Sequence, residues 1–243
     1  MAKLTQILIH GAKLVKVNGS YDQAFDIATE FAQKSGYYLR NTGINPMMTE
    51  GKKTVAFEIA ADNNFDPIDN IFVSVGDGCI IGSVYKGFYE LNKTRVIDWM
   101  PKIYGIQADG ANPIYRAFEN NKKDIDSQGA DTIADSISVG EPRDYQKALR
   151  AVRKSGGKYI SVSDKEIMDG QKKLAMEEGI YSEPAASAAY AGYLKESVKG
   201  KTVVLVTGNG LKDIKATIDT FDFHFMEIEP KGYDIEEIIR GIQ

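Results

Sequence analysis

The sequence predicts an α/β protein with a mostly parallel, twisted sheet and helices on both of its faces. Short apolar runs rich in β-branched residues alternate along the chain with segments of helical periodicity. The runs at 71–75, 103–106, 159–162 and 203–206 are almost continuously apolar. Such runs are typical of parallel strands covered on both faces, whereas strands with one wet face alternate apolar and polar residues.

The first sixty residues are expected to form short elements. Ser20 can cap a helix whose apolar positions include Phe25 and Phe31. The expected elements are, in order, a helix end at 4–10 stopped by Gly11, a strand at 14–17, a helix at 21–35, a strand at 37–39, a loop at 41–46 and a helix from Glu50 through Ile59.

A glycine turn follows the run at 71–75. Gly76 and Gly78 break this run, and apolar residues then return at helical spacing, at Ile80, Ile81, Val84, Tyr85 and Phe88. Glycine lets the backbone approach a phosphate without a Cβ in the way, and a strand, a glycine turn and a helix aim several N–H groups at one anion. The pattern predicts a phosphorylated ligand, with a purely structural turn as the alternative.

The rest of the chain continues the alternation of strands and helices. Its expected elements are a strand at 103–106, a helix at 113–118, a polar linker at 120–129, a helix at 144–155, a strand at 159–162, a helix at 164–178, an alanine-rich helix at 184–194, a strand at 203–206, a strand at 224–228 and a helix at 234–240.

Composition and charge exclude several classes of function. The chain has 243 residues, of which 43% are hydrophobic and 26% are charged, as is ordinary for a globular protein. Its 30 basic and 34 acidic residues are mixed along the sequence, so that no basic stripe for a nucleic acid is present. No apolar stretch approaches the length that spans a bilayer. We therefore expect a cytoplasmic protein with no nucleic-acid partner and no membrane association.

Cysteine and histidine are scarce, the chain carrying only Cys79, His10 and His224. A lone cysteine allows no internal disulfide and is typical of a reducing compartment. These residues form no spaced His/Cys metal site, so we expect no metal. His10 and His224 are interpreted as packing or surface residues rather than acid–base groups.

Four segments, in this order, resemble threonine synthase and its relatives among the fold-type II (tryptophan synthase beta-like) pyridoxal-phosphate enzymes. They are Glu-Gly-Lys-Lys-Thr-Val-Ala-Phe-Glu-Ile at 50–59, the glycine loop at 75–82, Glu-Pro-Ala-Ala-Ser-Ala-Ala at 183–189 and Val-Thr-Gly-Asn-Gly-Leu-Lys-Asp at 206–213. Weaker matches lie at 105–110 and 132–137. Each segment alone is a modest signal, but their joint order along the chain makes the resemblance specific.

The resemblance implies pyridoxal 5'-phosphate as the cofactor. The residues that it places around this cofactor are Gly76, Asp77, Gly78, Cys79 and Ile80 at the phosphate, Glu183 near the ring and Thr207 at the ring nitrogen. A hydroxyl at that nitrogen does not force it to stay protonated, which suits elimination and replacement better than transamination. Thr207 also follows a strand, and ligands bind outside the carboxyl ends of parallel strands. Without the resemblance, Thr-Gly-Asn-Gly would be interpreted as a plain turn.

The glycine loop departs from the commoner family pattern, Gly-Asn-Gly-Gly-Asn. Asp77 replaces the first asparagine, and a carboxylate several Å from a phosphate repels it by about 1 kcal/mol at an effective dielectric constant of ~20. We expect its side chain to point away from the phosphate or to cap its own loop. Cys79 is expected to be a buried thiol rather than a nucleophile.

One family feature is absent from this chain. Family members carry a Schiff-base lysine near the N-terminus and then a Ser-rich Gly-Asn-Thr-Gly loop for the substrate carboxylate. Residues 3–12 resemble the helix that follows both, and Lys52, Lys53 and Lys86 lie in segments with other roles, so no catalytic residue is assigned. We expect an N-terminally truncated chain, with 1–45 as the remnant of the small lobe and 46–243 as the large cofactor-binding lobe.

The resemblance implies a threonine synthase-like lyase that acts on a small-molecule amino-acid substrate by replacement or elimination, with phosphohomoserine to threonine as the leading case. Without the covalent lysine the chain is expected to be inactive alone. Two alternatives stay open: a non-catalytic phosphate-ligand-binding or regulatory module of the same fold, and a pyridoxal-phosphate-dependent ammonia-lyase or dehydratase. The expected partner is a second copy, in a homodimer, or a complementing N-terminal fragment, because half a lobe leaves apolar faces uncovered.

Overall fold

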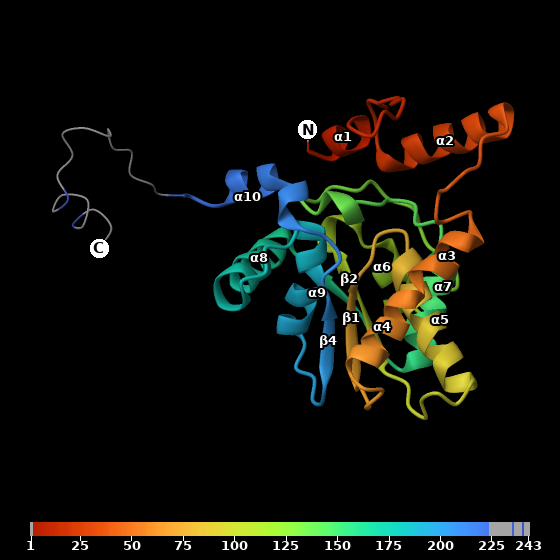
Figure 1. The fold of residues 1–243 in the computed structure, drawn as a ribbon, viewed down its shortest axis with the longest axis vertical. Coiled ribbons are helices and arrows are strands. Elements are labelled where there is room, and N and C mark those ends of the chain that lie inside the picture. Colours follow the sequence, from red (N-terminus) through yellow and green to blue (C-terminus); the bar gives the residue numbers. More distant parts are fainter. Residues whose placement is uncertain (1, 224–234, 236–239, 241–243) are drawn as a thin grey trace.

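A computed structural model of the chain describes residues 2–223, 235 and 240. Within these residues the chain forms a parallel sheet in the order β3-β2-β1-β4 (Figure 1). The strands are β1 (Asn70–Ser74), β2 (Lys102–Ala108), β3 (Tyr159–Val162) and β4 (Thr202–Leu205). The predicted α/β class and parallel sheet are confirmed, and each expected strand from 71 to 206 is present within one or two residues of its expected bounds.

The order of the strands creates a reversal point beside β1. The chain passes from β1 to β2 and β3 on one side, and then returns to place β4 on the other side of β1. Ile71 of β1 is in register with Ile103 of β2 and with Val203 of β4. The loops that leave the carboxyl ends of β1 and β4 therefore diverge around a crevice, where open α/β sheets bind their ligands.

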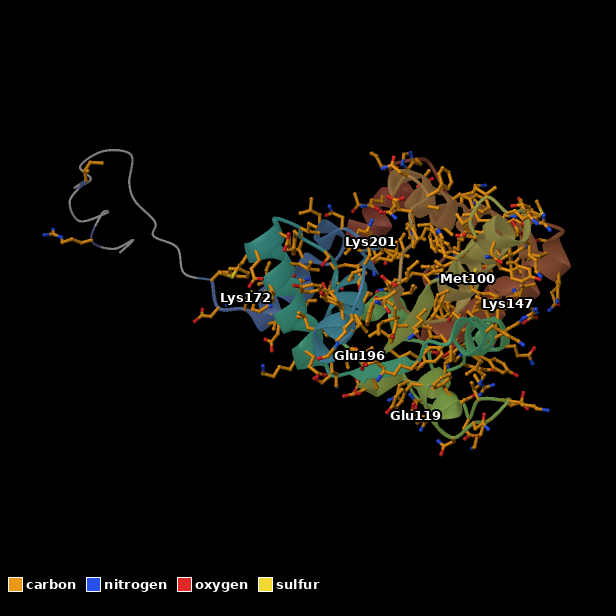
Figure 2. All side chains as sticks on the ribbon, turned by 90° about the horizontal axis from the view of Figure 1, so that it is seen from below. Met100, Glu119, Lys147, Lys172, Glu196 and Lys201 are labelled. Atoms are coloured by element: carbon orange, nitrogen blue, oxygen red, sulfur yellow. The ribbon has the colours of Figure 1, made fainter. Side chains whose placement is uncertain are left out.

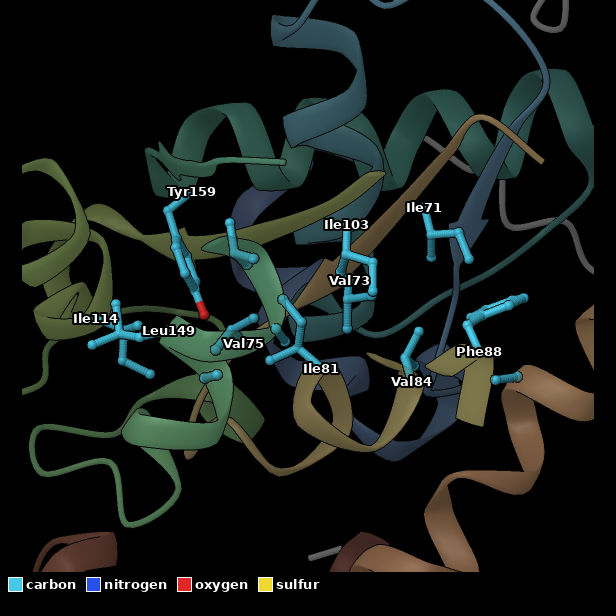
Figure 3. Packing of buried hydrophobic residues seen from close by; sticks show 14 of the residues in the cluster. Ile71, Val73, Val75, Ile81, Val84, Phe88, Ile103, Ile114, Leu149 and Tyr159 are labelled. Carbon is cyan, nitrogen blue, oxygen red and sulfur yellow. The ribbon is translucent and has the colours of Figure 1, made fainter. Parts of the chain in front are cut away.

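Helices cover both faces of the sheet, as predicted. One face carries α4 (Thr54–Asp62), α5 (Cys79–Lys93), α6 (Pro113–Glu119) and α7 (Tyr145–Ser155), and the other carries α9 (Pro184–Lys195) with α8 (Asp164–Glu178) packed on it. Successive side chains of a strand point to opposite faces, and the central residues of β1 are all apolar. Both faces of β1 therefore present apolar side chains. Ile71 and Val73 pack with Val84 and Phe88 of α5 (Figure 3), whereas Phe72 stacks on Tyr104 on the opposite face with ring centroids 4.5 Å apart.

The N-terminal region differs from its prediction in two places. Helix α1 (Ala2–Leu8) and helix α2 (Tyr21–Ser35) are present, and Ser20 caps α2 through a capping box with Gln23. The expected strands at 14–17 and 37–39 are wrong, since both segments are irregular. A strand needs a neighbour for its backbone hydrogen bonds, and no described strand lies beside either segment. Their side chains stay exposed, with Val15 at 84% and Tyr37 at 72%.

The helix expected to begin at Glu50 begins earlier and is interrupted. Helix α3 (Pro46–Lys52) starts after Asn45, whose side chain accepts a hydrogen bond from the Met47 N–H. An asparagine cap followed by proline at the first helical position is a strong start signal. Lys53 then separates α3 from α4.

The expected strand at 224–228 lies outside the described residues, as does most of the expected helix at 234–240. No described helix is long and apolar enough to cross a membrane, and no cluster of metal-ligating side chains occurs among the described residues. Charged side chains of both signs, including Lys147, Lys172, Glu196 and Lys201, are spread over several elements of the described structure (Figure 2).

Candidate active site

A cavity of about 680 Å³ opens at the carboxyl ends of β1 and β4. It lies between the start of α2, the loop between β1 and α5, the segment 135–139, and the loops around 183 and 207–212. All of the residues that the sequence predicted for the site line this one cavity: Gly76, Asp77, Gly78, Cys79, Ile80, Glu183 and Thr207. They come from three loops that are far apart in the sequence and meet because of the order of the strands.

The loop between β1 and α5 presents a run of backbone N–H groups without acceptors. The Val75 N–H bonds to the Ile106 carbonyl, and the next N–H with a partner among the described residues is that of Gly82, which bonds to Gly78. The N–H groups from Gly76 to Ile81 make no hydrogen bond within the described part of the chain. They surround the N-terminus of a helix of 15 residues, whose dipole also favours a negative charge. This donor set fits a phosphate group.

Gly76 and Gly78 are required because the loop packs closely against residues 137–148. Gly78 has a φ of +91°, and a Cβ there would lie 2.7 Å from the Cβ of Ala148. A Cβ on Gly76 would lie 3.1 Å from the Cα of Ile137. The glycines therefore let the loop pack tightly on residues 137–148, which holds its shape before any ligand arrives.

The carboxylate of Asp77 is engaged by neighbouring elements rather than by its own loop. It accepts a hydrogen bond from the Tyr21 hydroxyl of α2 and a second, of 3.0 Å, from the Arg143 N–H. Burial raises the pKa of the Tyr21 hydroxyl, and the bond to Asp77 raises it further. These donors satisfy Asp77 and delocalise part of its charge, but none of them is a cation.

Cys79 is buried, as the sequence predicted, with 6% of its surface exposed. Burial raises the pKa of the thiol, and the nearby Asp144 carboxylate adds to this shift. The neutral thiol form therefore dominates at pH 7, which makes Cys79 a poor nucleophile.

Glu183 joins the two loops on the opposite side of the cavity. It precedes α9, is 4% exposed, and its N–H bonds to the Gly208 carbonyl at 2.9 Å. One carboxylate oxygen pairs with Lys212 Nζ at 3.0 Å, and the other accepts from the Ser136 hydroxyl at 3.4 Å. Gly208 is needed there, because a Cβ would lie 2.0 Å from Glu183 Oε1.

Thr207 lies just beyond the end of β4 and is exposed to the cavity. Its hydroxyl makes no hydrogen bond with the described residues, so it is available to a ligand. The sequence did not predict the cavity positions of Tyr21, Lys52, Ser136 and Lys212. Lys52, Ser136 and Lys212 had a signal, since they lie in the resembling segments at 50–59, 132–137 and 206–213, whereas Tyr21 lies in none of them.

A loop of free N–H groups and a free hydroxyl at the reversal point of a parallel sheet define an α/β protein with a crevice that fits a phosphorylated ligand. Residues 1–208 match the family model described as pyridoxal-phosphate dependent enzyme, and the chain belongs to this family. Pyridoxal phosphate is the cofactor of the family, and the free N–H groups at 76–81 suit its phosphate.

Within the family, the chain is similar to threonine synthases. It is 42% identical over 225 residues to the threonine synthase of Methanocaldococcus jannaschii, which covers 90% of this chain and 55% of that protein. It is 40% identical over 226 residues to the enzyme of Methanosarcina acetivorans, with 90% and 56% covered. The chain thus spans little more than half the length of these relatives.

Solved structures share the fold at low sequence identity. A serine racemase from maize superposes with a TM-score of 0.68 at 17% identity, over 99% of this chain and 65% of that one. A threonine deaminase from Solanum lycopersicum superposes with a TM-score of 0.70 at 21% identity, over 88% and 62%. At these identities the likeness shows the fold alone.

Proposed function

We propose that this chain forms the cofactor pocket of a threonine synthase-type enzyme, which carries out replacement or elimination on an amino acid of the phosphohomoserine type. The similarity to threonine synthases supports the reaction class. The observation that carries the pocket is the run of free N–H groups at 76–81, which faces the same cavity as Thr207.

Each predicted residue has a role in this proposal. The N–H groups of the loop hold the cofactor phosphate, and the Thr207 hydroxyl bonds to the ring nitrogen. A hydroxyl donates a hydrogen bond without transferring its proton at neutral pH, so the nitrogen stays neutral. Glu183, paired with Lys212, keeps the loop after β4 against the start of α9 and so positions Thr207. When bound, the cofactor supplies the electron sink for the reaction.

Turnover in the proposed enzyme needs a lysine that binds the cofactor covalently. Lys52 and Lys212 line the cavity, but both lie in segments that the family resemblance assigns to other roles. Lys53 and Lys86 are held in ion pairs with Glu50. We therefore propose that the chain alone binds the cofactor without a covalent bond and does not turn over.

Residues 1–45, proposed as the remnant of a small lobe, leave several large apolar side chains exposed. Among the described residues of α2 only Phe25 is buried, whereas Phe31 is 60% exposed. Tyr37 and Tyr38 beyond the helix are 72% and 68% exposed. Apolar side chains gathered in this way are typical of a surface that further polypeptide covers. We propose a complementing N-terminal fragment, or a second copy, as that polypeptide.

Binding and turnover can be tested separately. Titration calorimetry with pyridoxine 5'-phosphate, which has no aldehyde, measures the pocket alone, and unphosphorylated pyridoxine is the control ligand. We expect the phosphate ester to bind and pyridoxine to bind far more weakly. Absence of binding by the phosphate ester would contradict the proposed pocket.

For turnover, threonine formation from O-phosphohomoserine is followed with the chain alone and with the N-terminal part of the Methanocaldococcus jannaschii relative added in trans. We expect threonine only in the second mixture. Threonine formed by the chain alone, together with one stoichiometric borohydride-reduced lysine, would overturn the proposed need for further polypeptide.

A further inference from the structure

The charges around the cavity are unfavourable to an anion. The charged residues that line it are Asp22, Asp77, Asp135 and Glu183 on the acidic side, and Lys52 and Lys212 on the basic side. The proposed ligand carries a phosphate dianion. A run of neutral N–H groups must therefore hold this dianion against an excess of carboxylates, unless a lysine assists.

Two of the carboxylates already have cationic partners. Asp135 pairs with Lys3 at 2.6 Å, and Glu183 pairs with Lys212 at 3.0 Å. Asp77 and Asp22 have neutral donors only, which for Asp22 is the Gly140 N–H at 3.2 Å. One oxygen of Asp22 is buried with no donor among the described residues.

Lys52 differs from every other lysine around the site. Its ammonium donates a hydrogen bond of 2.9 Å to the Thr42 hydroxyl, and both residues line the cavity. It forms no ion pair with any described residue. Lys53 and Lys86 nearby are each paired with Glu50 and Glu90. An ammonium has three donors, so two of those on Lys52 remain available.

The position of Lys52 brings its charge close to the phosphate loop. It is the last residue of α3, and α3 packs against α5, the helix that begins directly after the loop. Burial and Asp144 raise the pKa of the Cys79 thiol, while the Lys52 ammonium acts in the opposite direction. Cys79 is the first residue of α5, so the electrostatic field of Lys52 extends to the part of the loop where the free N–H groups lie.

We propose that Lys52, oriented by Thr42, binds the phosphate of the cofactor and offsets the negative charge of Asp77 and Asp22. This assignment rests on the proposed function of the cavity. A loop with a neutral residue at position 77 would need no such cation, whereas a loop with an aspartate does. The presence of Lys52 in the same cavity as Asp77 therefore explains how an atypical loop keeps its affinity for a phosphate.

The test compares Lys52→Gln with Lys123→Gln, which removes the same charge from an exposed residue outside the cavity. Calorimetry measures the dissociation constants of pyridoxine 5'-phosphate and pyridoxine for both variants. We expect Lys52→Gln to weaken binding of the phosphate ester about tenfold and to leave pyridoxine unchanged. Lys123→Gln is expected to bind both ligands as the unsubstituted chain does.

Further measurements distinguish the loss of the Lys52 charge from a loss of folding in the variant. Lys52→Arg keeps the charge and is expected to restore most of the affinity. The salt dependence of phosphate-ester binding is expected to be shallower in Lys52→Gln, since one ion pair is lost. Far-UV circular dichroism and urea unfolding check that the variants are folded.

The outcomes distinguish this proposal from the one on which it rests. Equal affinity of the unsubstituted chain and Lys52→Gln for the phosphate ester overturns the role of Lys52 and leaves the pocket intact. Failure of the unsubstituted chain to bind the phosphate ester overturns both proposals. Equal weakening of pyridoxine and its phosphate ester also overturns the role of Lys52, because the loss is then not directed at the phosphate.

Discussion

The hydroxyl of Tyr21 donates a hydrogen bond to the carboxylate of Asp77, which joins the first turn of α2 to the loop between β1 and α5. Next to it, the Arg143 guanidinium pairs with Asp26 of α2 at 2.9 Å and lies over the Phe25 ring. Tyr21 and Phe25 lie on one face of α2, because positions four apart in a helix are neighbours, and Asp26 is adjacent to Phe25. The aspartate that makes the loop atypical is thus the residue on which α2 docks.

Tyr21→Phe is expected to loosen α2 from the rest of the molecule. It removes a donor to a carboxylate, and hydrogen bonds to charged groups contribute about 1.5–3 kcal/mol. We expect the free energy of unfolding in urea to fall by about that amount, and amide exchange in α2 to become faster. Tyr37→Phe is the control, because Tyr37 is 72% exposed. Equal exchange rates in α2 of the two variants would argue against docking through Asp77.

The contribution of Tyr21 should also depend on pH. Its folded-state pKa is raised, first by burial and then by Asp77, while the unfolded value is about 10. The stabilisation is therefore complete below pH 10 and is lost as the pH rises from there towards the folded-state pKa. We expect the difference in unfolding free energy between the unsubstituted chain and Tyr21→Phe to stay constant from pH 7 to pH 9 and to shrink as the pH rises above 10. A difference that stays constant above pH 10 would contradict the assigned shift.

The positions of the strands could be predicted from the sequence because buried strands leave apolar runs in it. All residues of β1 are buried, and its three central residues, Ile71 to Val73, form a continuous apolar run. The segments around Val15 and Tyr37 carry a similar local signal, yet they form no strand because a strand also needs a neighbour. Local sequence reports the preference of a segment and does not report whether a partner is present.

The site was predictable in part for a related reason. Gly76 and Gly78 lie in a loop whose local pattern indicates a phosphorylated ligand, whereas Thr207 was predicted only through the family resemblance. The partners of Asp77 lie 56 and 66 positions away in the sequence, at Tyr21 and Arg143. Contacts of such separation depend on the order of the strands and on the docking of α2, and no spacing rule within one segment predicts them.

Gly78→Ala tests how tightly the phosphate loop is packed. An alanine at this position would have to adopt a φ of +91°, and its Cβ would lie 2.7 Å from the Cβ of Ala148. Gly156→Ala is a matched control, since Gly156 also has a positive φ, of +69°, but a Cβ there would have no neighbour within 4 Å. We expect Gly156→Ala to cost about 1 kcal/mol of unfolding free energy, and Gly78→Ala a further 1–3 kcal/mol from overpacking. Equal losses would show that the loop relaxes away from residue 148.

Cys79 offers a direct measure of how often the loop opens. The neutral, buried thiol is expected to react with a disulfide reagent at pH 8 far more slowly than a free cysteine. Since Cys79 is the single cysteine of the chain, the absorbance change reports this site alone. We expect saturating pyridoxine 5'-phosphate to slow the reaction further, because the ligand binds the conformation in which Cys79 is buried. A rate like that of the urea-unfolded chain would contradict the observed packing.

The substitution Tyr159→Phe in β3 is expected to stabilise the folded protein. Its ring fills the space left by Gly105 on the neighbouring strand, where a Cβ would lie 2.3 Å from the Tyr159 ring. The hydroxyl is buried in the apolar cluster and has no hydrogen-bond partner among the described residues (Figure 3). A buried hydroxyl without a partner costs about 1–3 kcal/mol, so Tyr159→Phe is expected to raise the free energy of unfolding by about 1 kcal/mol.

Tyr181→Phe is the matched variant for this test. The Tyr181 hydroxyl donates to Thr217 at 2.9 Å, and the Thr217 hydroxyl in turn donates to Gln171 at 3.2 Å. Its loss is therefore expected to lower the free energy of unfolding by about 1 kcal/mol. Urea denaturation of the two variants should thus give changes of opposite sign. Destabilisation by Tyr159→Phe would mean that the hydroxyl has a partner, such as a buried water, in solution.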